Sequence, residues 1–317
     1  ATAAVTSSCA DLLEMKSTYE LSADQYWKTV EDAETALSGV YASARMVFDR
    51  EYYWDGHGDY LRAKTGTMSM TPGYSLGYAG CRFDAIRRTE TATNYYKYLY
   101  GLVHRANYVI ENIRKMSAGN LTPSDRQELD VILAETRLLR GLGYFRLITM
   151  WGDVPYFDKV VDDNSIAYSI PRTPIEIVKD SVLADMTYAA DRLPDKAPAV
   201  GRVGKAAAFA FRGKVQLYWA CWNNFGWPEL GELGTFVPDK QKALAAYAAA
   251  ASDFREIILN ESKYGVALFR NGEPGECGPM GTADVLPNYY YMFIPSTGND
   301  SPESIMVMTH GGPGTDQ

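Results

Sequence analysis

The segment from Val131 to Pro155, VILAETRLLRGLGYFRLITMWGDVP, limits the possible folds of this chain more than any other. Apolar residues recur in it at steps of three and four and also fill the flanking positions, so apolar character extends around most of a helix circumference. Such a helix must pack against neighbours on several sides. Gly152 and then Pro155 predict its end, because glycine favours a left-handed helix C-cap and proline cannot continue a helix.

Two glycines and four charged residues in this segment predict tertiary contacts. Gly141 and Gly143 each lower intrinsic helix stability by up to about 1 kcal/mol relative to alanine, so we expect a neighbouring helix to approach closely there. The charged residues have no opposite charge three or four positions away, so we expect their partners on other elements or at the rim. These residues are Glu135, Arg137, Arg140 and Arg146. We therefore interpret the helix as structural; the alternative is that it carries catalysis or binding itself.

Hydrophobic periodicity predicts six helices along the chain. Ser22 with Gln25 has the spacing of a capping box, and Thr122 and Thr173 each precede a proline at the first helical position. The helix after Thr173 has a less uniform apolar face, which suggests a more peripheral position. The predicted ranges are 22–48, 95–116, 122–152, 173–193, 201–222 and 239–259.

The succession of helices predicts a mainly α fold built as an antiparallel stack. The helix pairs have roughly the size of tetratricopeptide repeats, although no strict repeat of about 34 residues is present. Little β-structure is expected. After Tyr264 the chain turns to glycine, proline and tyrosine, and Ile305, Val307 and Thr309 alternate with methionines as in a strand.

Composition excludes several classes of function. The formal net charge of -8 and the pI of about 5.1, with lysine and arginine scattered singly, exclude the basic face that nucleic acid requires. No apolar run approaches the roughly 20 residues that a membrane-spanning helix needs. We therefore expect no nucleic-acid partner, and any link to a membrane only through an anchor or a partner.

Reactive residues form no recognisable catalytic group. His57, His104 and His310 lie in separate contexts, and no nucleophile has a base at a defensible spacing. Asp55, His57 and Asp59 could hold a cation, but a hydrogen-bonded polar turn is the commoner result for such a sequence. We predict no catalytic residue, no metal and no cofactor.

The chain is rich in aromatic residues, with 23 tyrosines and 6 tryptophans, and many lie in long loops between the predicted helices. Aromatic rings with a polar edge suit sugars, because the C–H face of a sugar packs on a ring while its hydroxyls bond to polar neighbours. The alternative is that each loop aromatic packs in a small core beneath its own loop.

The stretch AETRLLRGLGYFRLITMWGDVPYF resembles the signature of the SusD/RagB family, in which an acidic-then-basic helix runs into an aromatic pair and a Gly-Asp-x-Pro corner. The resemblance implies a scaffold of degenerate tetratricopeptide-like repeats. It further implies a lipoprotein on the cell surface, in the outer membrane of a Gram-negative bacterium, which captures glycans or peptides for a SusC-like TonB-dependent transporter. In such proteins loop aromatics bind the ligand. The candidates in this chain are Trp54, Tyr74, Tyr78, Trp227 and Tyr289.

Cys9, in SSCADLLE, resembles the acylated cysteine of a bacterial lipoprotein. Thr6 stands where such signals usually have leucine, and residues 1–8 precede the cysteine, so an ordinary thiol remains the alternative. We expect an N-terminal arm over 1–21 with this candidate anchor. A SusD-like helical domain over 22–317 follows, which in the family continues into a further C-terminal region.

The leading functional hypothesis is a non-enzymatic surface protein that binds a glycan and delivers it to a transporter. Peptide binding is the alternative within the family. A helical glycoside hydrolase would instead need two carboxylates about 5 to 10 Å apart in an aromatic cleft. A scaffold that only docks partner proteins would need no aromatic loops.

Overall fold

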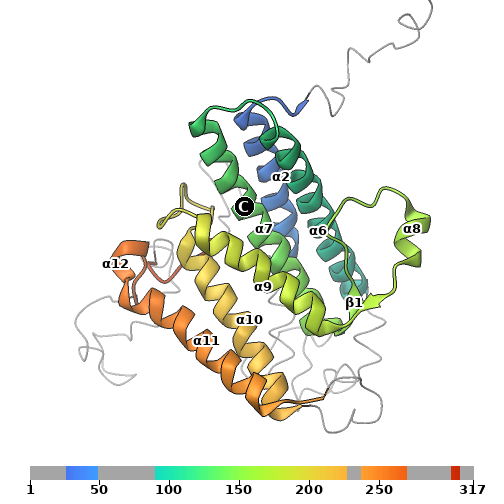
Figure 1. Cartoon of the computed structure of the whole chain (residues 1–317), viewed down its shortest axis with the longest axis vertical. Helices are drawn as coiled ribbons and strands as arrows, with labels where there is room; N and C mark the ends of the chain where they lie inside the picture. The colour runs from blue at the N-terminus through green and yellow to red at the C-terminus, as the bar shows by residue number, and fades with distance from the viewer. Residues whose placement is uncertain (1–25, 49–89, 227–236, 270–300, 308–317) are drawn as a thin grey trace, which may run out of the picture.

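The computed structural model describes residues 26–48, 90–226, 237–269 and 301–307, and in this part of the chain six long helices pack into one array, which we call the layer and in which α2 contacts both α6 and α7 (Figure 1). Each helix packs beside the next in the chain and runs in the opposite direction. The long helices are α2 (Val30–Phe48), α6 (Glu90–Ser117), α7 (Pro123–Trp151), α9 (Ile175–Arg192), α10 (Lys205–Phe225) and α11 (Lys240–Leu259). The prediction of a mainly α fold built from antiparallel helix pairs is confirmed.

Short elements complete the described part. They are the helices α8 (Asn164–Ser169) and α12 (Glu261–Tyr264) and the strands β1 (Val154–Pro155) and β2 (Arg172–Thr173). The two strands pair antiparallel, with Val154 opposite Thr173. They close the base of an arm that carries α8 away from the layer (Figure 1).

Helix α7 is the centre of the layer, as its sequence predicts. Nearly every residue from Ile132 to Ile148 is buried, because α2, α6 and α9 all pack on it. The helix begins where predicted, with the Thr122 side chain accepting a hydrogen bond from the backbone N–H of Asp125. It ends at Gly152, whose φ of 66° confirms the need for glycine, although its ψ of -122° lies outside the left-handed helical region that we expected.

The two α7 glycines face two different neighbours. A Cβ atom on Gly143 would lie 3.3 Å from Leu102 Cδ2 and 3.5 Å from Val103 Cγ2, both on α6. A Cβ atom on Gly141 would lie 3.5 Å from Asp185 Cβ on α9. The prediction that neighbouring helices approach α7 at both glycines is therefore confirmed.

Glu135 of α7 is fully buried and is bound by two distant residues. The Tyr41 hydroxyl donates to it over 2.6 Å, and the Arg202 guanidinium donates from Nε over 3.0 Å. These bonds to Glu135 hold the pKa of Arg202 above its ordinary value. Since Tyr41 lies on α2 and Arg202 precedes α10, one carboxylate ties three parts of the chain together.

Arg137 and Arg140 share one partner, the buried Asp185 of α9. Arg140 binds both carboxylate oxygens, at 2.8 and 2.7 Å, and also donates to Asn107 Oδ1 on α6 over 2.7 Å. Burial by itself would lower the pKa of Arg140, but the hydrogen bonds to Asp185 raise it above its usual value. The prediction that the partners of Glu135, Arg137 and Arg140 lie on other elements is confirmed.

The Gly-Asp-x-Pro corner is held by hydrogen bonds on both sides. The Tyr144 hydroxyl donates to the Phe157 carbonyl and accepts from the Phe157 N–H, each over 2.9 Å, and Tyr100 donates to the Pro155 carbonyl over 2.7 Å. The Asp153 carboxylate accepts from the N–H of Ile175, the first residue of α9, over 2.8 Å. The corner therefore sets where α9 begins.

Two predicted helix starts are wrong. The single helix predicted over 22–48 is interrupted at 27–29, and α2 begins at Val30, where Thr29 and Asp32 form a capping box; Ser22 lies outside the described residues. The N–H groups of Thr29 and Lys28, which donate to the Asp32 carboxylate, lower its pKa. Thr173 does not cap α9, because it pairs in β2 and Asp153 supplies the acceptor instead.

Two further predictions are wrong, one about the position of a helix and one about the conformation of a segment. Helix α9 is not peripheral, because it packs between α7 and α10. Residues 301–307 form turns rather than a strand, with the Pro302 carbonyl accepting from the N–H of Ala267 over 3.1 Å. Proline and glycine around this segment favour the turn conformation over a strand.

Candidate functional site

The predicted ligand-binding aromatics fall outside the described residues, and so do the candidate anchor and the DGHGD turn. They are Trp54, Tyr74, Tyr78, Trp227, Tyr289, Cys9, Asp55, His57 and Asp59. The described helices nevertheless fix the points where these segments leave and rejoin the scaffold.

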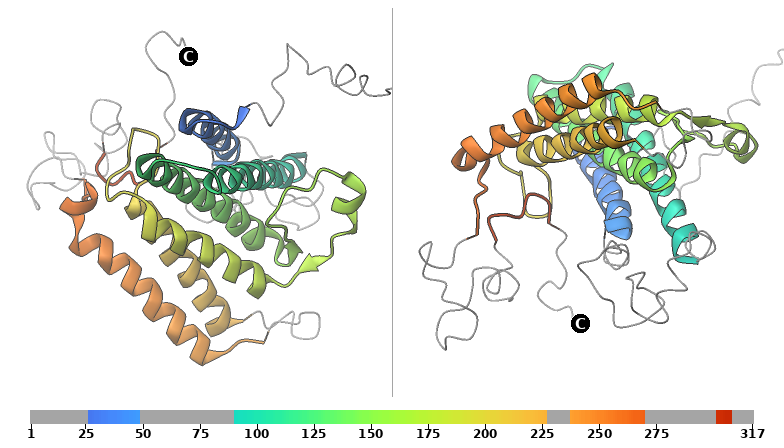
Figure 2. Two further views of the ribbon diagram at one scale, coloured as in Figure 1. Left: turned by 45° about the horizontal axis from the view of Figure 1, so that its top comes forward. Right: turned by 90° about the horizontal axis from the view of Figure 1, so that it is seen from below.

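Two aromatic-rich segments leave and rejoin the layer at the same end. The segment 49–89 joins the end of α2 to the start of α6, and the segment 227–236 joins the end of α10 to the start of α11. Because neighbouring helices alternate in direction, all four helix ends lie at the end where α7 also stops, which we call the loop end (Figures 1 and 2). Three interhelical steps of about 9 Å separate α6 from α10, so the two attachment points are roughly 27 Å apart.

The segment that carries Tyr289 is attached elsewhere. It connects Phe269 to Ser301, and Phe269 donates its N–H to the Glu303 carboxylate over 2.8 Å. Both attachment points therefore lie near α12, beyond the far end of α11 from the loop end (Figure 1). The scaffold groups Trp54, Tyr74, Tyr78 and Trp227 by their attachment and separates Tyr289 from them.

The scaffold contains a hollow of about 490 Å³ between α2 and α6, which we call the aromatic hollow. Its aromatic and basic lining residues are Tyr26, Trp27, His104, Arg105 and Tyr108. The Trp27 indole packs edge-on against Tyr26 at 5.5 Å and against Tyr108 at 5.8 Å, and its N–H donates to the Tyr108 hydroxyl over 3.3 Å. The rings thus hold one another in place.

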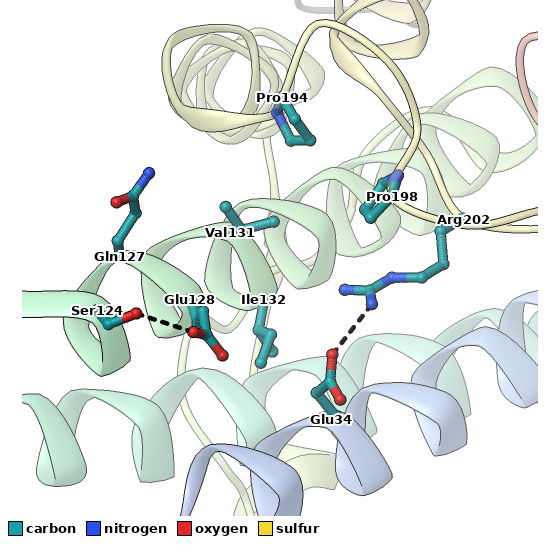
Figure 3. Close-up of a pocket in the computed structure, with 9 residues that line it drawn as sticks. All are labelled: Glu34, Ser124, Gln127, Glu128, Val131, Ile132, Pro194, Pro198 and Arg202. Carbon is teal, nitrogen blue, oxygen red and sulfur yellow. Dashed lines mark hydrogen bonds and ion pairs between the residues drawn. The ribbon is translucent and has the colours of Figure 1, made fainter.

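A second hollow, of about 400 Å³, lies between α2, the first half of α7 and the connection before α10 (Figure 3). Its polar residues bind one another. Arg202 pairs with Glu34 over 3.1 Å, and Ser124 donates to Glu128 over 3.2 Å. We call this the charged hollow.

The carboxylates of the charged hollow do not have the surroundings of an acid–base pair. The Glu34 side chain is 51% exposed and neutralised by Arg202, and Glu128 is also exposed. A glycosidase acid needs a carboxyl group that is shielded from water so that it stays protonated. Among the described residues, no group of three or more His, Cys, Asp or Glu side chains could hold a metal ion.

Sequence reasoning missed the aromatic hollow. It placed Tyr26 in a helix that continues unbroken to Phe48, whereas the helical conformation at Tyr26 stops at Trp27, and both residues line the hollow. The available signal was the adjacent Tyr-Trp pair at 26–27, separated from Thr29 by one residue, together with His104 and Tyr108 four residues apart on one helix face.

Comparison with known proteins gives a consistent result. A family model described as starch-binding and associating with the outer membrane matches residues 20–217. A SusD-like protein of Formosa agariphila is 26% identical over 208 residues, which cover 62% of this chain and 38% of that protein. The chain spans about two fifths of the length of this and two other curated relatives.

Solved structures share the fold. A SusD-like carbohydrate-binding protein of Bacteroides fragilis has a TM-score of 0.56 at 18% identity, covering 89% of this chain and 46% of that one. A structure with a xylogluco-oligosaccharide has a TM-score of 0.50 at 22% identity, covering 71% of this chain and 40% of that one. None of the described helices has both the length and the apolar character that crossing a bilayer requires.

Proposed function

The chain belongs to the SusD-like family, and on that premise we propose that it binds a glycan at the cell surface and delivers it to a SusC-like TonB-dependent transporter. The family is associated with starch binding and with the outer membrane. Structural neighbours include a carbohydrate-binding protein and a structure with a xylogluco-oligosaccharide, which support a glycan as the ligand. Peptide binding is the alternative within the family, and the array experiment below distinguishes the two ligands.

The residues of the family signature make hydrogen bonds within the scaffold, which supports ligand binding through the loops instead. Glu135, Arg140, Tyr144 and Asp153 all bind other parts of the same chain, so their polar groups are occupied. A ligand must then be recognised by residues outside this network. The loop end is the best candidate, because Trp54, Tyr74, Tyr78 and Trp227 are all attached there.

We propose that the protein binds its ligand without converting it. The carboxylates of the charged hollow are exposed and engaged, and the predicted ligand-binding residues are stacking aromatics rather than acids. Binding by aromatic stacking needs several rings that act together, because one ring orients a sugar poorly.

Attachment to the outer membrane would come from lipid at Cys9. The remainder of the predicted arm, 10–21, then links that anchor to the helical domain. A single acyl chain gives only marginal membrane binding, so stable attachment would require several acyl chains or a protein partner. The transporter is the natural partner in this proposal.

The test is to present the full chain to glycan and peptide arrays and to analyse each bound oligosaccharide by chromatography after incubation. We expect glycans to be bound and recovered intact. Binding of peptides alone would replace the glycan by a peptide ligand. Shortened oligosaccharides, absent after substitution of one carboxylate, would move the protein to the hydrolase class.

A further inference from the structure

The aromatic hollow brings together three rings that each keep part of their surface exposed. Tyr108 is 38% exposed although it lies on a long helix of the layer, and Tyr26 and Trp27 are half-buried beside it. Aromatic side chains of a helix normally turn into the core, as Tyr144 does here. Three rings are instead gathered around a cavity that opens to solvent.

The polar groups of the hollow complement the rings. The Arg105 guanidinium donates to the Gly39 carbonyl over 3.4 Å, the long limit of a hydrogen bond, and among the described residues it makes no other. The Tyr108 hydroxyl accepts from Trp27 and can still donate its own proton. His104 adds an exposed imidazole at the same rim. Partly exposed aromatic rings thus lie beside several hydrogen-bonding groups.

We infer that the aromatic hollow is a second saccharide-binding site on the scaffold, separate from the loop end. A sugar ring has the matching chemistry, because its C–H face packs on an aromatic ring while its hydroxyls accept from Arg105 and accept from or donate to Tyr108 and His104. The volume of about 490 Å³ lies within the usual range of small-molecule sites. This inference rests on the proposed glycan-binding function.

The position of the hollow gives the second site a role. Among the lining residues, Gly39 lies nine residues before the end of α2 and Tyr108 lies eighteen residues after the start of α6. At a rise of 1.5 Å per residue the hollow extends from about 14 to 27 Å along the helices from the loop end. Several linked sugar units span that distance, so one polysaccharide can occupy both sites. Tethering makes binding at the second site intramolecular and strengthens the whole interaction without a new contact.

A peptide fits the hollow less well. Proline-rich peptides also dock on aromatic rings, but they need an extended groove along which several residues lie. The aromatic hollow is lined by residues 26–27, by one short stretch of α2 (36–39) and by one of α6 (104–109), which is less than an extended groove provides. Binding of a proline-rich peptide here is an outcome that the test distinguishes.

The experiment uses the full chain on an array of plant, algal and microbial glycans that includes starch and xyloglucan fragments. Three proteins are compared: wild type, Trp27→Ala/Tyr108→Ala at the hollow and Trp54→Ala/Trp227→Ala at the loop end. We expect the hollow variant to bind a long polysaccharide at least about tenfold more weakly than wild type, while a short oligosaccharide is affected less. Urea unfolding of the hollow variant beside wild type controls for loss of folding, because Trp27 also packs against the core.

A second readout reports the hollow directly. The indole N–H of Trp27 gives one NMR signal, which Trp27→Phe identifies, and a sugar in the hollow should shift it in a saturable way. An unshifted Trp27 signal at saturating oligosaccharide, or a shift with a proline-rich peptide only, would overturn the second site and leave the proposed function standing. A wild-type protein that binds no glycan of the array would overturn both.

Discussion

Replacement of Gly143 by leucine tests the packing of α7 most severely. A Cβ atom there already lies 3.3 Å from Leu102 Cδ2, closer than ordinary van der Waals contact, and the rest of a leucine side chain would have to enter α6. Overpacking of this kind costs typically about 1 to 3 kcal/mol and sometimes more. We expect a large fall in the free energy of unfolding, which urea titration followed by circular dichroism would measure.

Gly101→Leu is the matched control. Gly101 lies within α6, is exposed, and has no atom within 4 Å of an added Cβ. Leucine should therefore stabilise the protein there by about 0.5 to 1 kcal/mol through helix propensity alone. The two variants should differ by about 2 to 4 kcal/mol. Equal unfolding free energies for Gly143→Leu and Gly101→Leu would refute the close contact between α7 and α6.

Three further predictions concern the hydrogen bonds of the scaffold. Arg202→Ala leaves the buried carboxylate of Glu135 without its cation and should cost about 3 kcal/mol in urea unfolding, with partial recovery in the double variant that also carries Glu135→Gln. Asp153→Ala removes the acceptor at the start of α9 and should cost about 1 kcal/mol, whereas Asp153→Asn, which keeps an acceptor oxygen, should cost less; equal losses would contradict the capping role. Burial raises the pKa of Tyr144 above its usual value of about 10, so its stabilisation is complete below pH 10 and is lost as the pH rises further. The stability advantage of wild type over Tyr144→Phe should shrink by about 1.4 kcal/mol between pH 8 and pH 11, and an unchanged difference would refute this assignment.

Local sequence chemistry predicted much of the scaffold. Thr122 caps α7, Gly152 ends it, and Gly141 and Gly143 mark close helix contacts, because each effect depends on a few neighbouring residues. The need of Glu135 for a distant partner also followed from its position in an apolar helix. The identity of that partner did not, because Arg202 is 67 residues away and only the folded layer brings the two together.

The position of α9 shows why some predictions failed. Its buried face includes Lys179 and Asp185, which in a sequence look like solvent-facing residues. Asp185 is neutralised by Arg137 and Arg140, and the Lys179 ammonium lies 4.6 Å from the centre of the Trp219 ring. Partnered charges thus replaced apolar residues on the face that packs, and Ile177 was left 53% exposed. The start of α9 was missed for a similar reason, since its acceptor Asp153 lies across the β1–β2 pair.

The sequence predicted the kind of ligand that the site binds, but not the place of every binding residue in the fold. Aromatic residues concentrated in loops indicated sugar binding, and the directions of the helices bring the attachment points of two such loops to one end. The aromatic hollow was not predicted, because Trp27 belongs to no helix face and its neighbour Tyr108 is 81 residues away.

The central claim is that the loop aromatics bind the ligand. Its most direct test is to titrate an oligosaccharide that the glycan array identifies into wild type and into Trp54→Ala by calorimetry. Urea unfolding of both proteins measures their stability. Trp219→Ala is the control for a core tryptophan, since Trp219 is only 5% exposed and its truncation should cost about 3 to 5 kcal/mol of stability. For Trp54→Ala we predict binding weaker by roughly 1 kcal/mol or more and nearly unchanged stability. A stability loss like that of Trp219→Ala, with oligosaccharide affinity of the folded protein unchanged, would contradict ligand binding through the loop aromatics.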